Sequence, residues 1–457
     1  MDGLIWSAAL WGVLLLILRV MGSEAARLSR EQWALVVVLL GTNSTVSRSA
    51  EAVLGNPLIG ETLIRGALAT IALVMVAPLV LARITGGRSV SFRGMTALTV
   101  YALIAALSTA YSVAPVSTAG KSYELAVALL IAWAIALRRD GRSIARETLE
   151  ILVLFSALQV AIAVIGFFAA PSLFAEVQSR TPFIGTATMV SPYSHSNGLS
   201  AAGAMLSAYA LARWLGRAQR VDGETSASLL SSRMWAALFV TGTLGTILAS
   251  ARQGLVIWIV SVTVVLWVFR RRLLLLTLPL GGAIVVSNWD VVWAIVSRNQ
   301  NASSLATWSG RLLYWQSGLE ALSDHPFLGF GFGVGGRFVA LLRIGSGHIS
   351  SVHSGYVEAL MGVGLLGIVP LLYAIWSAGR WSLARLRSRT DVALGALIAP
   401  LALHTSVSLG FGGWLTDSVV LFMLLVVLSD LEGPRPPPRF GRRRGPTAVG
   451  QRAKLTS

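Results

Sequence analysis

Residues 148–170, TLEILVLFSALQVAIAVIGFFAA, decide the fold class of this chain. An α-helix needs about 20 such residues to cross the hydrocarbon core of a bilayer. A spanning segment must also be helical or part of a closed barrel, because lipid offers the backbone no hydrogen-bond partners. The stretch therefore predicts a transmembrane helix. Comparable apolar blocks occupy residues 3–22, 31–47, 62–83, 94–114, 122–138, 198–216, 233–250, 253–269, 273–294, 355–378, 392–409 and 415–431.

The composition favours the same class of protein. Of the 457 residues, 55% are hydrophobic and 12% are charged, and the mean hydropathy is +0.71. Soluble domains carry about 25% charged residues. We therefore predict an all-α, polytopic membrane protein with about 12–13 transmembrane helices. No small-residue cleavage site follows block 3–22, so we take this block as a retained helix and not as a signal peptide.

Cysteine content and net charge exclude several kinds of site. The chain has no cysteine, which excludes a disulfide framework, a thiolate nucleophile and a cysteine-based metal site. The net charge of +17 arises from 37 Lys and Arg against 20 Asp and Glu. These cations lie mostly in short loops and a tail, where the positive-inside rule and anionic lipid explain them. Binding to nucleic acid is not needed, and no motif for it is present.

The arginines also predict the topology. Every second loop between apolar blocks is basic, as after blocks 62–83 and 122–138, and basic loops mark the cytoplasmic side. The N-terminus is then outside if all blocks span. We divide the chain into N-terminal transmembrane helices at 1–170, a catalytic region at 171–431 and a basic, disordered, cytoplasmic tail at 432–457. A large extracytoplasmic loop with short helices is expected at about 295–354.

The segment at 307–367 is unusually polar for its place between apolar blocks. It contains His325, His348, His353, Arg311, Arg337, Arg343 and a Gly-rich stretch. The predicted outward side also receives His195, His404, Arg180, Arg252 and Arg298. These arginines oppose the positive-inside bias, and a cation at membrane depth is costly without an anionic partner. They are therefore candidate functional residues.

Arg252 and Arg311 are the strongest cationic candidates. Arg252 lies in ASARQG, between two apolar blocks, and Arg311 opens an amphipathic helix. For each, the simpler interpretation is an interfacial arginine that reaches the headgroups. Two cations at one aqueous mouth would instead suit a diphosphate, because a guanidinium fork matches phosphate oxygens.

His353 is the strongest candidate for a base. It stands at the start of a predicted helix, followed by Ser354 and Glu358, after a flexible Gly- and Ser-rich segment. A neutral imidazole there could accept a proton from an attacking hydroxyl. A histidine at a helix end is more often an interfacial residue, and His348 is a second candidate. His195 precedes a helix start and reads as a capping residue, His325 as a turn residue and His404 as a packed residue.

One pattern is rejected as a nucleotide site. Gly331, Gly333 and Gly336 match a dinucleotide-binding spacing, but no strand precedes them. We interpret this stretch as a flexible turn.

Several short motifs together resemble a known family. SGRLLYWQSGLEALSDHPFLGFGFG at 309–333 resembles the Arg-bearing helix and the Pro–Gly–Gly turn of the O-antigen ligase and polymerase family. His353 and Ser354, followed after nine residues by Gly364, Leu365, Leu366 and Gly367, match its histidine motif. ASARQG resembles its Ser-x-Arg helix start and SPYSHSNGLSAA its Asn-containing loop, although Ser196 stands where the family often has a proline. The resemblance covers roughly residues 180–410.

The resemblance implies an inverting, metal-independent glycosyltransferase of the GT-C type in the inner (cytoplasmic) membrane, with its active site facing the periplasm or cell exterior. The donor would be a polyprenyl-diphosphate-linked glycan, the acceptor a hydroxyl of a glycan, glycolipid or protein, and no cofactor is implied. Arg252 and Arg311 would bind the diphosphate, and His353 would activate the acceptor. Substrate-binding roles are expected for Arg180, His195, Asn197, Arg337, Arg343, His348 and Glu358.

Three alternatives stay open at this point. One is a repeat-unit polymerase of the same family. A second is an SEDS-type peptidoglycan polymerase, which would need an outward catalytic aspartate in a convincing motif. The third, from another class, is a transporter or flippase of lipid-linked sugars. A transporter is expected to show midplane charges or inverted repeats, and the sequence shows neither.

Overall fold

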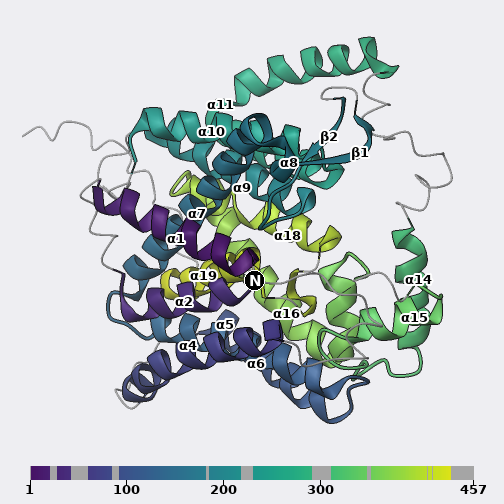
Figure 1. Ribbon diagram of the computed structural model, residues 1–457. Coiled ribbons are helices and arrows are strands. Elements are labelled where there is room, and N and C mark those ends of the chain that lie inside the picture. The colour runs from purple at the N-terminus through teal and green to yellow at the C-terminus, as the bar shows by residue number, and fades with distance from the viewer. Residues whose placement is uncertain are drawn as a thin grey trace, which may run out of the picture.

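The computed structural model describes residues 2–20, 28–42, 60–84, 92–181, 185–217, 230–290, 310–346, 351–408, 410–413 and 415–433. These residues form a bundle of helices with one small antiparallel sheet (Figure 1). The N-terminal helices are α1 (Asp2–Val20), α2 (Arg30–Thr42), α4 (Gly60–Ile84), α5 (Arg93–Leu107), α6 (Pro115–Ala136), α7 (Gly141–Ala169) and the short α8 (Pro171–Phe174). Strands β1 (Ala175–Thr181) and β2 (Gly185–Met189) form a hairpin. The C-terminal helices are α9 (Ser196–Arg217), α10 (Ser232–Leu248), α11 (Arg252–Ser287), α14 (Arg311–Leu322), α15 (Leu341–Arg343), α16 (Gly355–Ser388), α17 (Val392–Gly395), α18 (Ile398–Val407) and α19 (Asp417–Glu432).

The predicted fold class is confirmed. Six helices among the described residues are long and apolar enough to cross a membrane, and the described part of each predicted apolar block falls mainly on helical structure. The blocks at 253–269 and 273–294 fall on one helix, α11, which has a non-helical break at Arg270. Beyond this break α11 turns away from the bundle (Figure 1). The chain is thus an all-α, polytopic membrane protein with one small β-hairpin, and the expected total of 12–13 spans stays a prediction.

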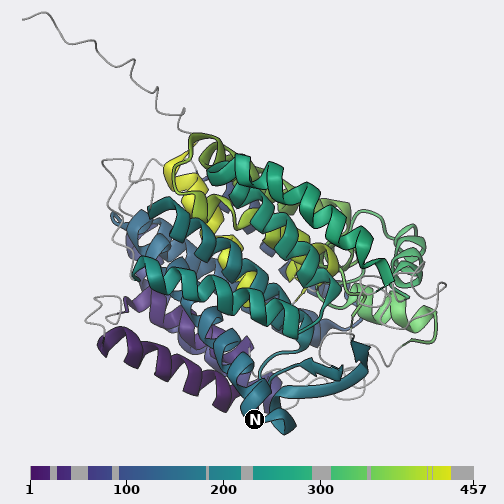
Figure 2. The same cartoon turned by 90° about the horizontal axis from the view of Figure 1, so that it is seen from above.

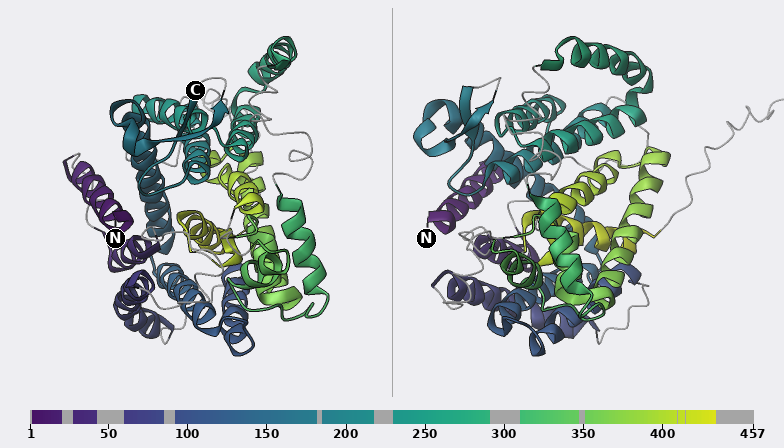
Figure 3. Two further views of the ribbon diagram at one scale, coloured as in Figure 1. Left: turned by 45° about the vertical axis from the view of Figure 1, so that its right-hand side comes forward. Right: turned by 90° about the vertical axis from the view of Figure 1, so that its right-hand side faces the viewer.

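Burial separates an enclosed helix from lipid-facing ones. Every residue of α19 from Val419 to Ser429 is buried, and α19 packs against α5, α6, α7 and α16. By contrast, α4 exposes large apolar side chains such as Leu63, Val74 and Leu81. Helix α1 lies at the edge of the bundle in both views of Figure 3. In a membrane, exposed apolar side chains of this kind face lipid, so exposure here marks the outer surface of the bundle.

Arginines of the basic loops meet buried glutamates at one end of the bundle. Glu432 accepts hydrogen bonds from Arg142 at 2.7 Å, from Arg146 at 2.8 Å and from Arg385, and Trp381 Nε1 donates to it at 3.1 Å. Glu31 pairs in the same manner with Arg83 and Arg138. The opposite end of the bundle holds α14, α15 and the β-hairpin, which Figure 2 shows gathered together.

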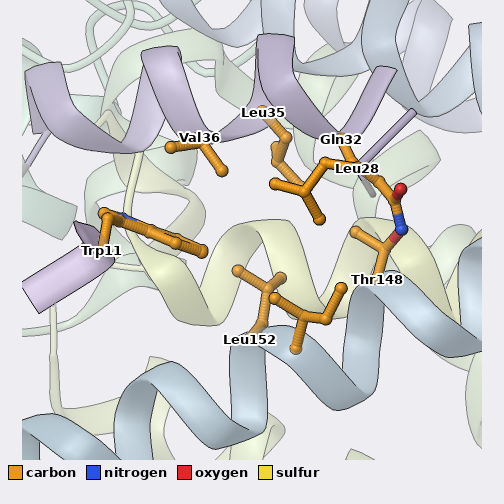
Figure 4. Close-up of a pocket in the computed structure, with 8 residues that line it drawn as sticks. Trp11, Leu28, Gln32, Leu35, Val36, Thr148 and Leu152 are labelled. Atoms are coloured by element: carbon orange, nitrogen blue, oxygen red, sulfur yellow. The ribbon is translucent and has the colours of Figure 1, made fainter. Parts of the chain in front are cut away.

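A small gap lies between α1, α2 and α7. Figure 4 shows it lined mainly by apolar side chains, namely Trp11, Leu28, Leu35, Val36, Ile151 and Leu152, with Gln32 and Thr148 at one side. Gln32 Nε2 donates to Thr148 Oγ1 at 3.1 Å, and Trp11 stacks on Phe155. The gap contains none of the candidate functional residues, so we interpret it as a packing defect between helices.

Candidate functional site

The Gly-rich stretch is a packed loop that forms hydrogen bonds with the backbone groups left unpaired by a break in α16. The helix is interrupted at Gly364 (φ 61°, ψ −164°), which frees backbone groups inside an apolar segment. Residues 326–331 supply the missing partners: Leu365 N–H donates to Pro326 O at 2.9 Å, and Phe330 N–H donates to Met361 O at 2.8 Å. Because unsatisfied backbone groups are costly away from water, the loop and the broken helix stabilise each other.

The connection between α5 and α6 holds the other side of this loop. Phe332 N–H donates to Ser108 Oγ at 2.9 Å, and Lys121 Nζ donates to Gly333 O at 2.6 Å. Residues 331–338 are buried. Gly331 has a φ of +111°, and a Cβ there would lie 2.2 Å from Ser112 Oγ. The expected flexible turn is therefore wrong: this loop is clamped between two parts of the bundle. Within the described residues 310–346, helix α14 and not a strand comes before this loop, in agreement with its rejection as a nucleotide site.

Residues Ser351–Ser354, which we call the histidine strap, carry His353. Val352 is fully buried; its N–H donates to Glu358 Oε1 at 3.1 Å, and its carbonyl accepts from Trp315 Nε1 at 2.9 Å. His353 has a φ of +55°, and its N–H donates to Ser351 Oγ at 2.9 Å. Ser354 caps α16 by accepting from Val357 N–H, so the helix expected near His353 begins at Gly355.

Arg311 stands at the first turn of α14. Gly310 precedes it with a φ of +83°, a conformation that glycine adopts without strain. Arg311 Nη1 donates to Val407 O at 3.4 Å. Val407 is the last residue of α18, and the carbonyls at a helix C-terminus carry partial negative charge. This contact holds the guanidinium beside the end of α18.

The N-termini of α9 and α11 bring three further candidates together. Gln253 Nε2 donates to Asn197 O at 3.3 Å, and Asn197 N–H donates to His195 Nδ1 at 3.3 Å. Close packing makes this possible, because a Cβ on Gly254 would lie 1.8 Å from Ser200 Oγ. His195, Asn197 and Arg252 therefore occupy one corner of the bundle. The expected capping role of His195 agrees with this hydrogen bond.

Electrostatic interactions join these pieces into one site. Burial, the Arg311 charge and the His195 charge lower the pKa of His353 to about 4. Burial and the nearby Arg252 charge lower the pKa of Arg311. His353 is consequently neutral at pH 7, whereas Arg311 stays protonated because arginine titrates far above that pH. We call Arg252, Arg311 and His353 the cationic cluster. In this cluster Arg311 interacts electrostatically with the neutral His353 and with Arg252, and an anion would offset the repulsion between the two guanidiniums.

The remaining candidates lie in varied positions. Arg337 is 2% exposed and interacts electrostatically with Glu358, which is itself buried. Arg343 is exposed at the end of α15. Arg180 lies on β1, but its side chain is outside what the structure describes, and His348 is outside the described residues altogether. His325 is exposed and packs edge-on against Phe330, and His404 is buried on α18.

Sequence reasoning missed a set of charged residues in the N-terminal half. Lys121 interacts electrostatically with Glu358, Arg337, Arg65 and Glu124. Arg65 Nε donates to Glu124 Oε1 at 2.8 Å. One signal could have revealed this set: the chain has only two lysines, Lys121 and Lys454, among its many arginines. A lone lysine at the start of an apolar block is costly unless it has a charged partner.

Comparison with protein families relates the segment around the cationic cluster to a known family. A family model described as O-antigen ligase matches residues 229–372. This segment is similar to the O-antigen ligase family. The resemblance drawn from the sequence motifs is thereby confirmed. No curated protein matches the chain. The O-antigen ligase segment contains the whole cationic cluster, whereas His195, Asn197 and Lys121 lie outside it.

The match to the O-antigen ligase model supports an enzyme role for the chain without specifying the reaction. O-antigen ligase family members are ligases and polymerases of the glycosyltransferase kind that use lipid-linked glycans in a membrane. In the part of the chain that the structure describes, no group of three or more histidine or acidic side chains is placed to hold a metal ion. The donor set of the cationic cluster is likewise suited to anions and not to metals, because guanidiniums cannot ligate a cation.

Proposed function

We propose that this protein is an inverting, metal-independent glycosyltransferase that moves a glycan from a polyprenyl-diphosphate carrier to an acceptor hydroxyl. The reaction takes place at the outer face of the cytoplasmic membrane, and the protein is a multi-pass component of that membrane with a cytoplasmic C-terminus. The observation that carries the proposal is that Arg311 interacts electrostatically with both Arg252 and His353. The catalytic region comprises residues 171–431, and 1–170 form a supporting set of helices.

In this proposal the two arginines bind the diphosphate. When the anomeric carbon–oxygen bond breaks, negative charge develops on the leaving diphosphate. Fixed guanidiniums stabilise that charge without reorganisation, as other phosphate clamps do. The planar fork of arginine also makes two parallel hydrogen bonds to phosphate oxygens. Arg311 comes from α14 and Arg252 from α11, so the diphosphate would bridge two helices.

His353 receives the proton of the acceptor. The acceptor oxygen forms a bond to the anomeric carbon from the face opposite the diphosphate, and its proton passes to the neutral imidazole. Inversion follows from this single displacement. A pKa of about 4 keeps His353 unprotonated and ready to accept at pH 7. Binding of the anionic diphosphate then offsets the Arg311 charge and makes the imidazole more basic when the proton arrives.

Glycan binding is assigned to polar residues around the cluster. We propose His195 and Asn197 as contacts at the corner formed by α9 and α11, where they adjoin Arg252. Arg180, Arg343 and His348 are proposed as contacts on the outward surface. Arg337 and Glu358 are buried, and their support of the proposed function is indirect.

The test is transfer in purified protein supplied with lipid-linked donor. Arg252→Ala and Arg311→Ala are each expected to lower the transfer rate by about 100-fold or more, as for loss of one oxyanion-stabilising donor. Both are also expected to weaken binding of undecaprenyl diphosphate in a direct titration. Arg387→Ala, which removes an exposed arginine of α16's last turn, is the matched control and should change neither quantity. Normal transfer by Arg311→Ala would refute the proposal.

Cells lacking the protein distinguish a ligase from a polymerase. Accumulation of full-length polymer on the lipid carrier identifies a ligase. Accumulation of single repeat units on the carrier identifies a polymerase of the same family. Unimpaired glycan assembly on the outer face, together with donor trapped on the inner face, would point to a transporter and would contradict both.

A further inference from the structure

Glu358 ties the histidine strap to α16. The carboxylate is 2% exposed, and its Oε1 accepts from Val352 N–H at 3.1 Å. The Val352 carbonyl is held by Trp315 of α14. Both polar backbone groups of Val352 are therefore fixed by side chains of different helices. Because Trp315 lies one turn beyond Arg311, the same contacts set the position of the strap relative to the arginine-bearing helix.

The Glu358 side chain leaves no room for side chains larger than glycine at positions 336 and 412. A Cβ on Gly336 would lie 2.6 Å from Glu358 Oε2, and a Cβ on Gly412 would lie 2.1 Å from Glu358 Cβ. Two glycines thus allow the packed loop and the turn before α19 to close over the carboxylate. A side chain enclosed in this manner has one geometry available, which is what an anchoring role requires.

A buried carboxylate is stable only with cations nearby. Glu358 interacts electrostatically with Arg337 and Lys121. Lys121 Nζ is fixed by Gly333 O at 2.6 Å, within the same loop that carries Gly336 and Arg337. Arg65 and Glu124 are the other charged groups that act on Lys121, and they pair with each other. Lys121 and Arg337 therefore supply the charge that Glu358 needs to stay in place.

We propose that Glu358 is a positioning residue for His353, and that Lys121 of α6 supports this role by supplying positive charge to Glu358. The inference rests on the proposed function of His353 as the base. His353 adopts a φ of +55°, a conformation that costs a side-chain-bearing residue energy and persists only where the surroundings enforce it. The bonds at Ser351, Val352 and Ser354 enforce it here. Glu358 accepts the bond from Val352, the residue directly before His353.

The residues that we propose to position His353 extend beyond the O-antigen ligase segment. Lys121 lies far outside residues 229–372, on a helix of the N-terminal half. Thr118, one turn earlier on α6, donates to Phe332 O at 3.2 Å. The N-terminal helices therefore contribute to the order of the strap as well as to the bundle.

The first test follows the strap without any reference to catalysis. The chain has no cysteine, so Val352→Cys introduces one buried thiol at a position that is 0% exposed and keeps the backbone groups bound by Glu358 and Trp315. This thiol should react slowly with a maleimide in the parent protein. Added Glu358→Leu should raise the labelling rate at least tenfold, and added Lys121→Met should raise it in the same direction. Glu320→Gln, an exposed glutamate of α14 bonded to Gln316, is the matched control and should leave the rate unchanged.

The second test separates positioning from binding. Glu358→Leu should lower kcat by about 100-fold, the cost of misplacing a catalytic group by about 1 Å. Its KM for lipid-linked donor and its affinity for undecaprenyl diphosphate should stay within twofold. Glu358→Gln, which keeps an acceptor for Val352 N–H, should recover most of kcat, and Lys121→Met serves as the disrupting variant if Glu358→Leu does not fold. The effects of Glu358→Gln and Lys121→Met on kcat should be non-additive, because both substitutions change the balance of charge around residue 358.

The outcomes separate this inference from the proposed function. Unchanged labelling in both Glu358 variants would overturn the positioning role, whatever the activity. Faster labelling with a normal kcat would overturn it as well. If Glu358→Leu speeds labelling but the parent protein transfers no glycan, the anchoring of the strap is supported and only the proposed function is refuted.

Discussion

His353 combines an unusual backbone with a low proton affinity. Its φ is +55°, and its pKa is lowered to about 4 by burial and by the charges of Arg311 and His195. The residue itself could be predicted from the sequence, because a histidine beside outward arginines is unusual in an apolar chain. Its left-handed conformation could not, since that depends on Glu358 and Trp315, which approach Val352 only in the folded bundle.

The low pKa leads to a prediction about pH. The base must be neutral, so protonation of His353 should inactivate the enzyme. In the free protein, kcat/KM should fall on acidification only as pH approaches 4. In the donor complex the diphosphate offsets the Arg311 charge and raises the pKa of His353, so kcat should fall at a higher pH. Steady-state rates between pH 4 and 8 measure both profiles. Coincident acid limbs for kcat and kcat/KM would contradict the assignment.

The packed loop and the broken α16 form one structural element. Its sequence reads as a flexible turn because Gly and Phe alternate in it without any helical or strand period. The structure shows why the glycines are needed: Gly331 lies against Ser112, and Gly364 opens the helix toward the loop. Hydrogen bonds between residues 326–331 and 361–366 cannot be inferred from local pattern, because neither segment is regular by itself.

Gly331→Ala should test this element. The new Cβ would lie 2.2 Å from Ser112 Oγ at a φ of +111°, so both steric overlap and strain are expected. We expect a loss of about 1–3 kcal/mol in stability, measured as a lower thermal midpoint in detergent.

Gly345→Ala is the matched control for this change. Gly345 also has a positive φ, of +68°, but a Cβ there meets nothing within 4 Å. It should cost less than Gly331→Ala. Equal losses from the two substitutions would show that the loop is not clamped as the structure indicates.

At the scale of the whole molecule, charge is segregated between two ends. The buried Glu432 gathers Arg142, Arg146 and Arg385 at one end, and the cationic cluster lies at the other. The three paired arginines come from basic loops that the sequence assigns to the cytoplasm. Their acidic partner could not be found by pattern, because Glu432 is at the end of the final apolar helix and looks like a simple boundary residue.

Glu432→Gln should destabilise the bundle strongly. Its carboxylate is fully buried and the Arg385 side chain is 10% exposed, so the change leaves buried cations without a counter-charge. Breaking one partner of a buried pair costs about 3–5 kcal/mol. Asp140→Asn is the control: Asp140 is 53% exposed and pairs with Arg138 at the surface, where a pair contributes under about 1 kcal/mol. Thermal midpoints of purified variants compare the two. Similar shifts would contradict the buried network.

Single cysteines test the orientation of the two ends. Ser323 follows α14 and Arg387 lies in the last turn of α16, and both are exposed. In intact cells a membrane-impermeant thiol reagent should label Ser323→Cys and not Arg387→Cys. Labelling of Arg387→Cys should require permeabilised cells. The reverse pattern would place the cationic cluster in the cytoplasm and would remove the proposed site from the outer face.

The sequence by itself determined the helical membrane class and the apolar blocks, and it predicted the arginines and the histidine of the cationic cluster as candidate site residues. These depend on local properties: the hydropathy of about 20 consecutive residues and the types of residue between such blocks. Only the tertiary structure decided that α9, α11, α14 and α18 meet at one site, that the Gly-rich stretch is packed, and that Lys121 reaches Glu358. The physical reason is that packing, burial and charge pairing act through space between residues far apart in the chain, and no local pattern records which of them meet.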